Sequence, residues 1–201
     1  MVGVIGPRVR GTRQVRGSVG TVTVFALSAM VGAAITGSLI GLLGGAAQAL
    51  AGERTLAVAV GAAGCLLLLA DLRMRTPTLR RQTCSTWYRE RGARFAWPVW
   101  GFDLGLGFST IRLSSLYWLM ALFVAAFVSP VLAPLALAFY GLGLGAAFAA
   151  AVIAQAWSRP SATASPGLGL LRAAARVRLA SLALLGAVSI AIVFSQGAPW
   201  T

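Results

Sequence analysis

The sequence has no histidine and no lysine, and it contains only four acidic residues and two cysteines among its 201 residues. Without histidine, a zinc, haem or His-based catalytic site of the usual kind is nearly excluded, so we expect no enzymatic activity, no metal and no cofactor. Cys65 and Cys84 lie far apart, form no CxxC pattern and have no partner at a useful spacing. Both thiols are therefore expected to be structural.

Charge is scarce as well, because charged residues make up 10% of the chain and hydrophobic residues 58%. A soluble chain of this length needs more polar side chains to cover its surface. The sequence therefore predicts an all-α, polytopic transmembrane helix bundle, in which a basic cytoplasmic segment over residues 1–18 precedes a single transmembrane domain over residues 19–201. The expected location is a bacterial cytoplasmic membrane.

All seventeen basic residues are arginines, which gives a net charge of +13. Arginine without lysine, with abundant Ala, Gly, Leu and Val, is typical of a GC-rich genome such as that of an actinobacterium. The arginines lie between apolar segments and not in a separate basic domain, so nucleic acid is not an expected partner. We expect contact with anionic lipid headgroups and consider a second integral membrane protein or another copy of the chain as further partners.

Five apolar segments are long enough to be considered as membrane spans. The first could also be read as a signal peptide, because Ala47-Gln48-Ala49 looks like a cleavage site, but its length favours a retained anchor. The expected spans cover residues 19–43, 55–72, the central stretch 98–132, 134–157 and 179–194. Two cytoplasmic loops, 73–97 and 158–178, separate them, and 78–91 is either a basic helix lying on the headgroups or a solvated loop.

The arginines predict the orientation. With the N-terminus inside, fifteen of the seventeen fall on the cytoplasmic side, whereas only Arg54 falls outside and only Arg112 falls within a candidate span. Short loops rich in arginine are retained in the cytoplasm. We therefore predict an N-in, C-out topology with five spans, or six if an overlong segment crosses twice.

Glycines recur at helical spacing in two of the spans and remove side chains from one helix face, so that another helix can approach closely. We interpret them as packing positions within the monomer in preference to a homodimer face. The helix-packing residues are Gly37, Gly41, Gly45, Gly141 and Gly145.

The central stretch, residues 98–132, is almost wholly apolar but carries Asp103 and Arg112. As one helix it would be about 52 Å long, against a hydrocarbon core of about 30 Å, so it must bend, break or lie partly along the surface. In one layout the span is 113–132 and Arg112 lies at the cytoplasmic boundary. In the other, the helix starts near Pro98 and Arg112 lies near the midplane, where a charge indicates a functional site.

In the second layout Arg112 needs a partner, and Asp103 lies on the opposite face of a straight helix. The glycines at 101, 105 and 107 would permit a break between the two charges, as in the discontinuous helices of several transporters. A paired, Gly-rich overlong segment in the first span suggests an inverted repeat with breaks in both segments. The candidate substrate-binding residues are Arg112, Asp103, Ser109, Thr110, Thr36 and Ser38.

Residues 101–122 resemble the second-repeat helix of the CcdA/DsbD transmembrane family, which moves reducing equivalents across bacterial membranes. The similar features are Gly105-Leu106-Gly107 and the aromatic and hydroxyl pair at Phe108 and Ser109. The family's Pro-Cys pair is replaced here by Thr110 and Ile111, and residues 35–38 also lack the family's cysteine. The resemblance implies an inverted-repeat transporter scaffold without the redox chemistry, and no functional residue is carried over.

Two functions follow as hypotheses. The first is a permease-like transporter of a small polar or anionic solute, with its site at the Gly-rich breaks and Arg112 facing the solute. The alternative is a non-catalytic partner that assembles with another integral membrane protein through its glycine faces. A membrane redox carrier is less favoured because the family's cysteines are missing.

Overall fold

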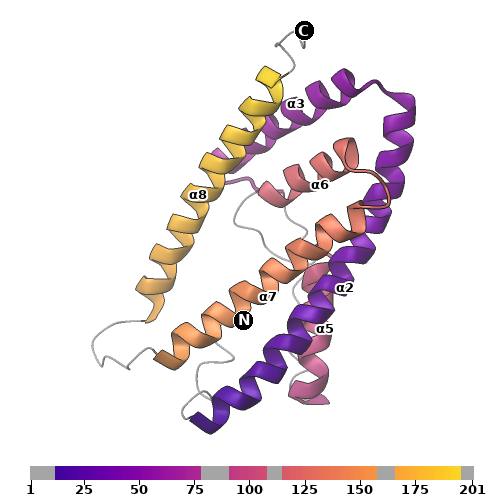
Figure 1. The fold of residues 1–201 in the computed structure, drawn as a ribbon. Coiled ribbons are helices and arrows are strands. Elements are labelled where there is room, and N and C mark those ends of the chain that lie inside the picture. Colours follow the sequence, from indigo (N-terminus) through magenta and orange to yellow (C-terminus); the bar gives the residue numbers. More distant parts are fainter. Residues whose placement is uncertain (1–11, 78–90, 108–114, 158–165, 196–201) are drawn as a thin grey trace. The chain divides into compact units, whose positions relative to one another are not determined.

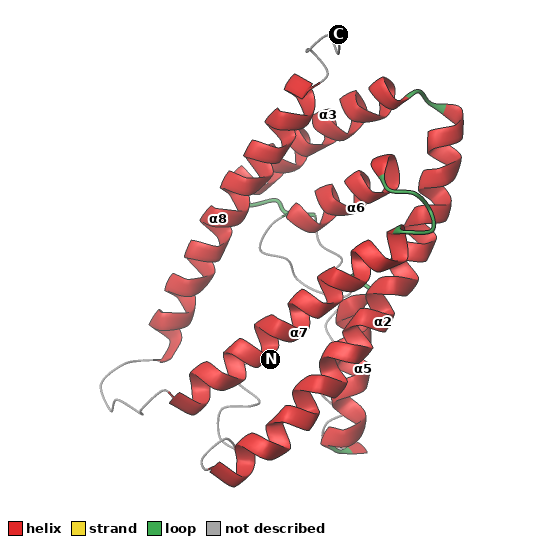
Figure 2. Ribbon diagram, in the orientation of Figure 1, coloured by secondary structure: helices red, strands yellow, loops and turns green. Residues whose placement is uncertain are grey.

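The computed structural model describes residues 12–77, 91–107, 115–157 and 166–195. These residues form helices joined by turns and contain no strand (Figures 1 and 2). The helices are α2 (Thr12–Leu50), α3 (Glu53–Leu72), α5 (Ala93–Gly105), α6 (Leu116–Phe127), α7 (Ala133–Trp157) and α8 (Pro166–Ser195). The all-helical architecture agrees with the fold class predicted from sequence.

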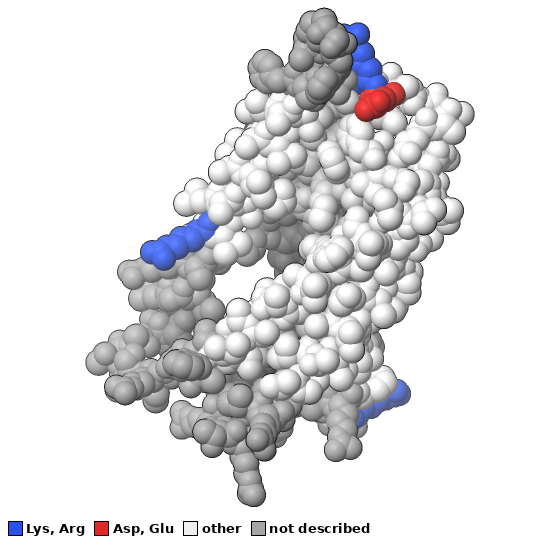
Figure 3. Space-filling model, viewed as in Figure 1, with Lys and Arg blue, Asp and Glu red and all other residues white. Residues whose placement is uncertain are grey.

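Four helical segments in the described part of the chain are long and apolar enough to cross a membrane. They are Val19–Leu50, Glu53–Leu72, Ala133–Ile153 and Ala175–Ile192, and Leu116–Phe127 is a shorter apolar helix. The surface drawn in Figure 3 is mostly uncharged, with charged side chains at the top, at the lower right and at one place on the left. The chain therefore has the make-up of a multi-span membrane protein, while the predicted number of spans and the N-in, C-out orientation stay predictions.

The helix bounds agree with the sequence prediction for α3 and α7 and differ for α2, α5 and α8, and α5 begins at Ala93, inside the loop expected over 73–97. α3 and α7 begin within two residues of the expected positions. The first span was expected to break at its glycines, but this expectation is wrong, because α2 is continuous from Thr12 to Leu50. The loop expected over 158–178 is also shorter, because α8 begins at Pro166, and Pro is well suited to the first turn of a helix.

The chain divides into two compact units, each assembled from three segments of sequence. Unit 1 comprises Met1–Thr36, Arg81–Ser109 and Pro134–Ala162, and unit 2 comprises the remaining residues. The N-terminal part of α2 thus belongs to unit 1 and its C-terminal part to unit 2. Neither unit is a continuous half of the chain, and the inverted repeat stays a prediction.

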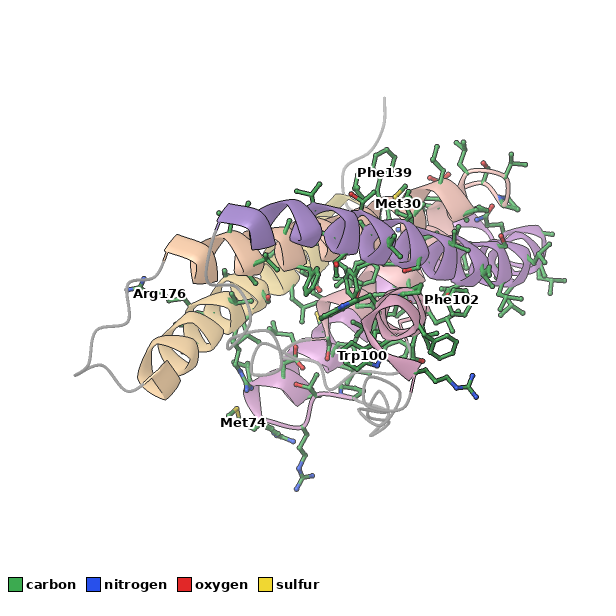
Figure 4. All side chains as sticks on the ribbon, turned by 90° about the horizontal axis from the view of Figure 1, so that it is seen from below. Met30, Met74, Trp100, Phe102, Phe139 and Arg176 are labelled. Carbon is green, nitrogen blue, oxygen red and sulfur yellow. The ribbon has the colours of Figure 1, made fainter. Side chains whose placement is uncertain are left out.

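Unit 1 packs α2, α5 and α7 around an aromatic cluster. Phe25 from α2 lies 4.5 Å, centroid to centroid, from Phe148 of α7, and Trp97 and Trp100 of α5 meet edge to face at 5.2 Å. All four rings belong to or pack against one buried cluster, and Trp100, labelled in Figure 4, is almost fully buried. Such offset and edge-to-face pairs add to the stability gained by burial.

Unit 2 packs α3, α6, α8 and the end of α2 around aliphatic side chains. Val60, Leu119, Ala126 and Leu185 form its buried core. Leu119 and Leu185 are almost completely inaccessible, at 2% and 0% exposure. The short α6 is therefore fixed between longer helices rather than lying at the edge of the unit.

Candidate functional site

The break predicted in the central stretch is present at the end of α5. The amide of Leu106 donates to the carbonyl of Phe102 at 2.9 Å, and the amide of Gly107 donates to that of Leu104 at 3.1 Å. Gly107 has φ 76°, a left-handed conformation that ends a helix and that glycine adopts at little cost. α5 thus stops after thirteen residues, too few to cross a membrane, and the next described helix, α6, starts at Leu116.

Thr36 of α2 lies against this break. Its hydroxyl donates to the carbonyl of Leu106 at 3.0 Å, and the side chain is 1% exposed. The last carbonyls of a helix have no partner within the helix, and in a membrane they need one from elsewhere. Thr36 supplies that partner, so a residue singled out from sequence reaches the break that was predicted from the glycines.

No contact with the break is described for the other predicted solute-binding residues. Asp103 is half-buried on α5, two residues before its end. Ser38 is exposed on α2 and belongs to unit 2. Arg112, Ser109 and Thr110 lie outside the described residues. The roles assigned to all of them from sequence stay predictions.

Asp71, at the end of α3, is the most deeply buried acid in the described part of the chain and is fully inaccessible. One carboxylate oxygen, Oδ2, accepts from the backbone amide of Ser115 at 2.6 Å, and the other, Oδ1, accepts from its hydroxyl at 2.7 Å. Ser115 immediately precedes α6. The negative charge therefore lies at the positive, N-terminal end of α6, where a helix is stabilised by an anion.

Asp71 also connects α3 to α8. Its backbone carbonyl accepts from Nη2 of Arg178 at 2.6 Å. A cation at the C-terminal end of a helix is favoured because the last carbonyls there carry partial negative charge. One residue thus joins α3, α6 and α8 within unit 2, using its carboxylate for one helix and its carbonyl for another.

Gln48 of α2 serves the opposite end of α6. Its side-chain amide, Nε2, donates to the carbonyl of Ala125 at 2.8 Å and to that of Val128 at 3.2 Å. α6 has twelve residues and is about 18 Å long, which is shorter than a hydrocarbon core of about 30 Å. If α6 is placed across a membrane, at least one of its ends therefore lies in the apolar region. Side chains from two other helices satisfy its exposed backbone groups, as an apolar environment requires.

Sequence reasoning did not identify Asp71 or Gln48 as structural centres. A signal for Asp71 was present, because a carboxylate in the last turn of an apolar helix is opposed by the helix dipole and so indicates a partner outside that helix. Gln48 is a polar residue in a long apolar helix, which also predicts a hydrogen bond to another helix. Both signals predict a partner, but neither says which helix supplies it.

Glycines in unit 1 allow the backbones of neighbouring helices to come into direct contact. A Cβ atom at Gly141 of α7 would lie 2.6 Å from the carbonyl oxygen of Ala29, and one at Gly145 would overlap Ala26. On α5, a Cβ at Gly105 would overlap the carbonyl of Ala29 as well. Gly143, between the two α7 positions, has nothing within 4 Å of such a Cβ. α2 is therefore in close contact with both α5 and α7.

Gly41 and Gly45 of α2, which belong to unit 2, face the turn after α6. A Cβ at Gly41 would lie 2.8 Å from that of Ala133 and 2.9 Å from the carbonyl oxygen of Pro130, and one at Gly45 would lie 2.8 Å from Cγ of Pro130. Gly37 is buried. The glycine positions of α2 and α7 whose contacts are described here thus face segments of their own chain.

Comparison with known protein families, with curated proteins and with solved structures finds no match to this chain. The resemblance to the CcdA/DsbD family accordingly stays a prediction from sequence.

Proposed function

We propose that this protein is a permease-like integral membrane protein that moves a small polar or anionic solute past the break at the end of α5. The observation that carries the proposal is the hydrogen bond from the buried Thr36 hydroxyl to the Leu106 carbonyl, at the point where α5 stops. Irregular backbone at membrane depth is tolerated where protein covers it or where it lines a solute-accessible cavity. Transporters commonly build their sites from such discontinuous helices.

The break brings together groups suited to a polar solute. A hydroxyl and a backbone carbonyl can each exchange their mutual hydrogen bond for one to a solute at little net cost. Asp103, three residues before Leu106, and Arg112, predicted from sequence to face the solute, would add charges of either sign. Arg112→Ala is expected to reduce the flux of anions more than the flux of neutral solutes.

The alternative function, assembly with another membrane protein through glycine faces, is less well supported. Gly41, Gly45, Gly141 and Gly145 each face a segment of their own chain at a distance that leaves no room for a side chain. A partner helix could not use these positions without displacing that segment. Four of the five glycine positions on which the assembly hypothesis depended thus contact segments of the same chain.

A vesicle experiment tests the proposal. The purified protein is reconstituted into liposomes, and the entry of glycerol, urea, nitrate and acetate is followed by light scattering after rapid mixing. We expect at least one of these probes to enter faster than into protein-free liposomes. Thr36→Val, which keeps the shape of the side chain but removes the hydroxyl, should change that rate by about fivefold or more, equivalent to roughly 1 kcal/mol.

Thr23→Val is the matched control. Thr23 lies on the same helix, and its hydroxyl donates to the carbonyl of Val19, one turn away in α2, at 3.0 Å. Its loss should leave the rate unchanged. Equal rates for wild type and both variants would contradict a pathway at the break, and rates no faster than in protein-free liposomes for every probe would contradict transport of this solute class. Gel filtration shows whether the variants remain folded.

A further inference from the structure

The C-terminal end of α3 is a rigid, hydrogen-bonded turn. The amide of Arg75 donates to the carbonyl of Ala70 at 2.8 Å, and the amide of Met74 donates to that of Asp71 at 3.0 Å. This pair of bonds is the Schellman arrangement, in which the residue after the cap is left-handed. Here that residue is Met74, with φ 59°, the sole non-glycine residue of positive φ in the described part of the chain. A side chain is unfavourable in this conformation, so its presence suggests that the turn is retained for more than ending the helix.

The turn presents positive charge that the described protein does not neutralise. Arg73 and Arg75 are exposed, and within the described residues neither guanidinium forms an ion pair. Asp71, the nearby acid on α3, directs its carboxylate inward to Ser115. Arg178 of α8 is fixed beside them by its bond to the Asp71 carbonyl. Arg73 and Arg75 follow the last turn of α3, which the guanidinium of Arg178 contacts, so three arginines from two helices lie at this end of unit 2.

Apolar side chains alternate with these arginines. Leu72 is 60% exposed and Met74 is 74% exposed, and Figure 4 shows Met74 projecting from the end of α3. The indole of Trp118, the third residue of α6, donates to the carbonyl of Pro77 at 2.9 Å, so the segment after the turn lies against an aromatic ring of the type found at membrane interfaces. The apolar segment of α3 also ends here, at Leu72.

We propose that this end of unit 2, formed by Arg73, Arg75, Arg178, Met74 and Trp118, is a binding site for the headgroup of an anionic phospholipid. The guanidinium groups would hold the phosphodiester through charge-assisted hydrogen bonds, for which arginine is well suited. Met74 and Leu72 would contact the first carbons of the acyl chains. The Schellman turn keeps the two exposed arginines on a short, fixed segment, which lowers the entropy lost on binding.

A lipid fits these residues better than free phosphate does. A site for a free anion gains nothing from two large apolar side chains exposed beside its cations, whereas a lipid buries them. The surface also lies where the apolar segment of α3 ends, and headgroups are expected at the end of a membrane-spanning segment. The proposal is independent of transport, because it concerns binding at the end of α3 and not the break after α5.

The test measures lipid binding by the full chain in a neutral detergent at about 0.1 M salt, with short-chain phosphatidylglycerol as the probe. Arg73→Gln with Arg75→Gln should weaken binding by about 20- to 30-fold, since each basic residue near an anionic surface contributes a factor of about five. Arg75→Gln alone should weaken it about fivefold, and Arg75→Lys, which keeps the charge but not the planar set of donors, should restore only part of that loss.

Arg54→Gln is the matched control, because Arg54 is exposed on the same helix at its opposite end and carries the same charge. It should leave phosphatidylglycerol binding within about twofold, since charges separated by more than a Debye length are largely screened. An equal loss for Arg54→Gln and Arg75→Gln would overturn the site, because net charge alone would then explain the binding.

Two further arms decide the chemistry. Phosphatidylcholine should bind more weakly than phosphatidylglycerol and should be insensitive to Arg75→Gln; equal sensitivity would overturn recognition of an anionic headgroup. Inorganic phosphate at millimolar concentration should compete poorly, and full displacement of the lipid by it would overturn the lipid in favour of a free anion. Thermal unfolding in the absence of lipid, unchanged in each variant, would show that any loss of binding is not a loss of folding.

Discussion

Unit 1 and unit 2 are held together by different means. In unit 1, glycines on α5 and α7 bring backbones into contact with α2, and aromatic rings fill the remaining space. In unit 2, an aliphatic core is combined with side-chain hydrogen bonds that serve both ends of the short α6. In lipid there is little hydrophobic drive between helices, so close van der Waals contact and interhelical hydrogen bonds must supply association. Close glycine contacts occur in both units, and the described part of unit 2 adds the hydrogen bonds that cap both ends of α6.

The difference predicts different sensitivities. Unit 1 should tolerate loss of a polar group but not added volume at its glycines, because close contact leaves no space for a side chain. Unit 2 should tolerate changes of volume at its exposed positions but not loss of the groups that satisfy α6. The following predictions test this distinction, from the largest expected effect to the smallest.

Gly105→Leu should have the largest effect. Even a Cβ atom at this position would overlap the carbonyl of Ala29, and its contacts include the Ala29 Cα at 2.9 Å, which belongs to backbone and cannot rotate away. We expect a loss of about 3 kcal/mol or more in the free energy of unfolding in detergent, followed by tryptophan fluorescence. Gly143→Ala, where nothing lies within 4 Å, is the control and should lose no stability. Similar losses at both positions would contradict a specific backbone contact.

Asp71→Ala should destabilise unit 2 by about 2 to 3 kcal/mol, because it leaves the buried amide and hydroxyl of Ser115 without their acceptor and removes the anion from the start of α6. Glu53→Ala, at the exposed start of the same helix, should change stability by less than about 0.5 kcal/mol. A double-mutant cycle with Ser115→Ala should give a coupling energy of about 1 kcal/mol or more. Strict additivity would show that the pair does not act together.

Gln48→Leu should cost about 1 to 2 kcal/mol, because the carbonyls of Ala125 and Val128 lose the amide that donates to them. Hydrogen exchange should report the effect as faster exchange in the C-terminal half of α6, while the aromatic cluster of unit 1 keeps its protection. Leu50→Ala, which removes a side chain that is 89% exposed, provides a control. Unchanged exchange in α6 would mean that this cap contributes nothing.

The smallest effects should come from the two left-handed residues that end helices, and they should have opposite signs. Met74→Gly should stabilise the chain by up to about 1 kcal/mol, because glycine adopts φ 59° without a steric cost. Gly107→Ala should destabilise it by about 1 kcal/mol for the same reason. Thermal unfolding of both variants in one detergent measures the pair. A destabilising Met74→Gly would show that the methionine side chain contributes contacts that outweigh the strain.

Sequence alone predicted the helices whose ends are marked by charge or proline. α3 begins at Glu53 and α7 begins beside Pro134, and both were placed within two residues. The glycines of α2 were harder to interpret, because a glycine series is equally consistent with a break and with close packing. In the structure α2 continues through its glycines, while Gly107, in a left-handed conformation, ends α5. The local sequence does not distinguish the two roles, because the neighbouring helix decides between them.

The candidate site was predicted in part. The break in the central stretch followed from its length, and Thr36 was selected, although its partner, the Leu106 carbonyl, is a backbone group that a sequence pattern does not reveal. Asp71 was overlooked because its carboxylate acts on Ser115, 44 residues later in the chain. Contacts over such separations depend on how the helices are arranged, and that arrangement is set by many small packing terms.

The capping of α6 has a consequence for how the chain is made. Both side chains that serve its ends, Gln48 and Asp71, precede it in the sequence, so they are synthesised before α6 leaves the ribosome. A helix of twelve residues is too short to be stable across a bilayer alone. It can nevertheless insert into the membrane beside α2 and α3, where Gln48 and Asp71 are already available to hydrogen-bond to its two ends. Arg178 and the rest of α8 follow last, so unit 2 is completed from a hairpin that already holds the short helix in place.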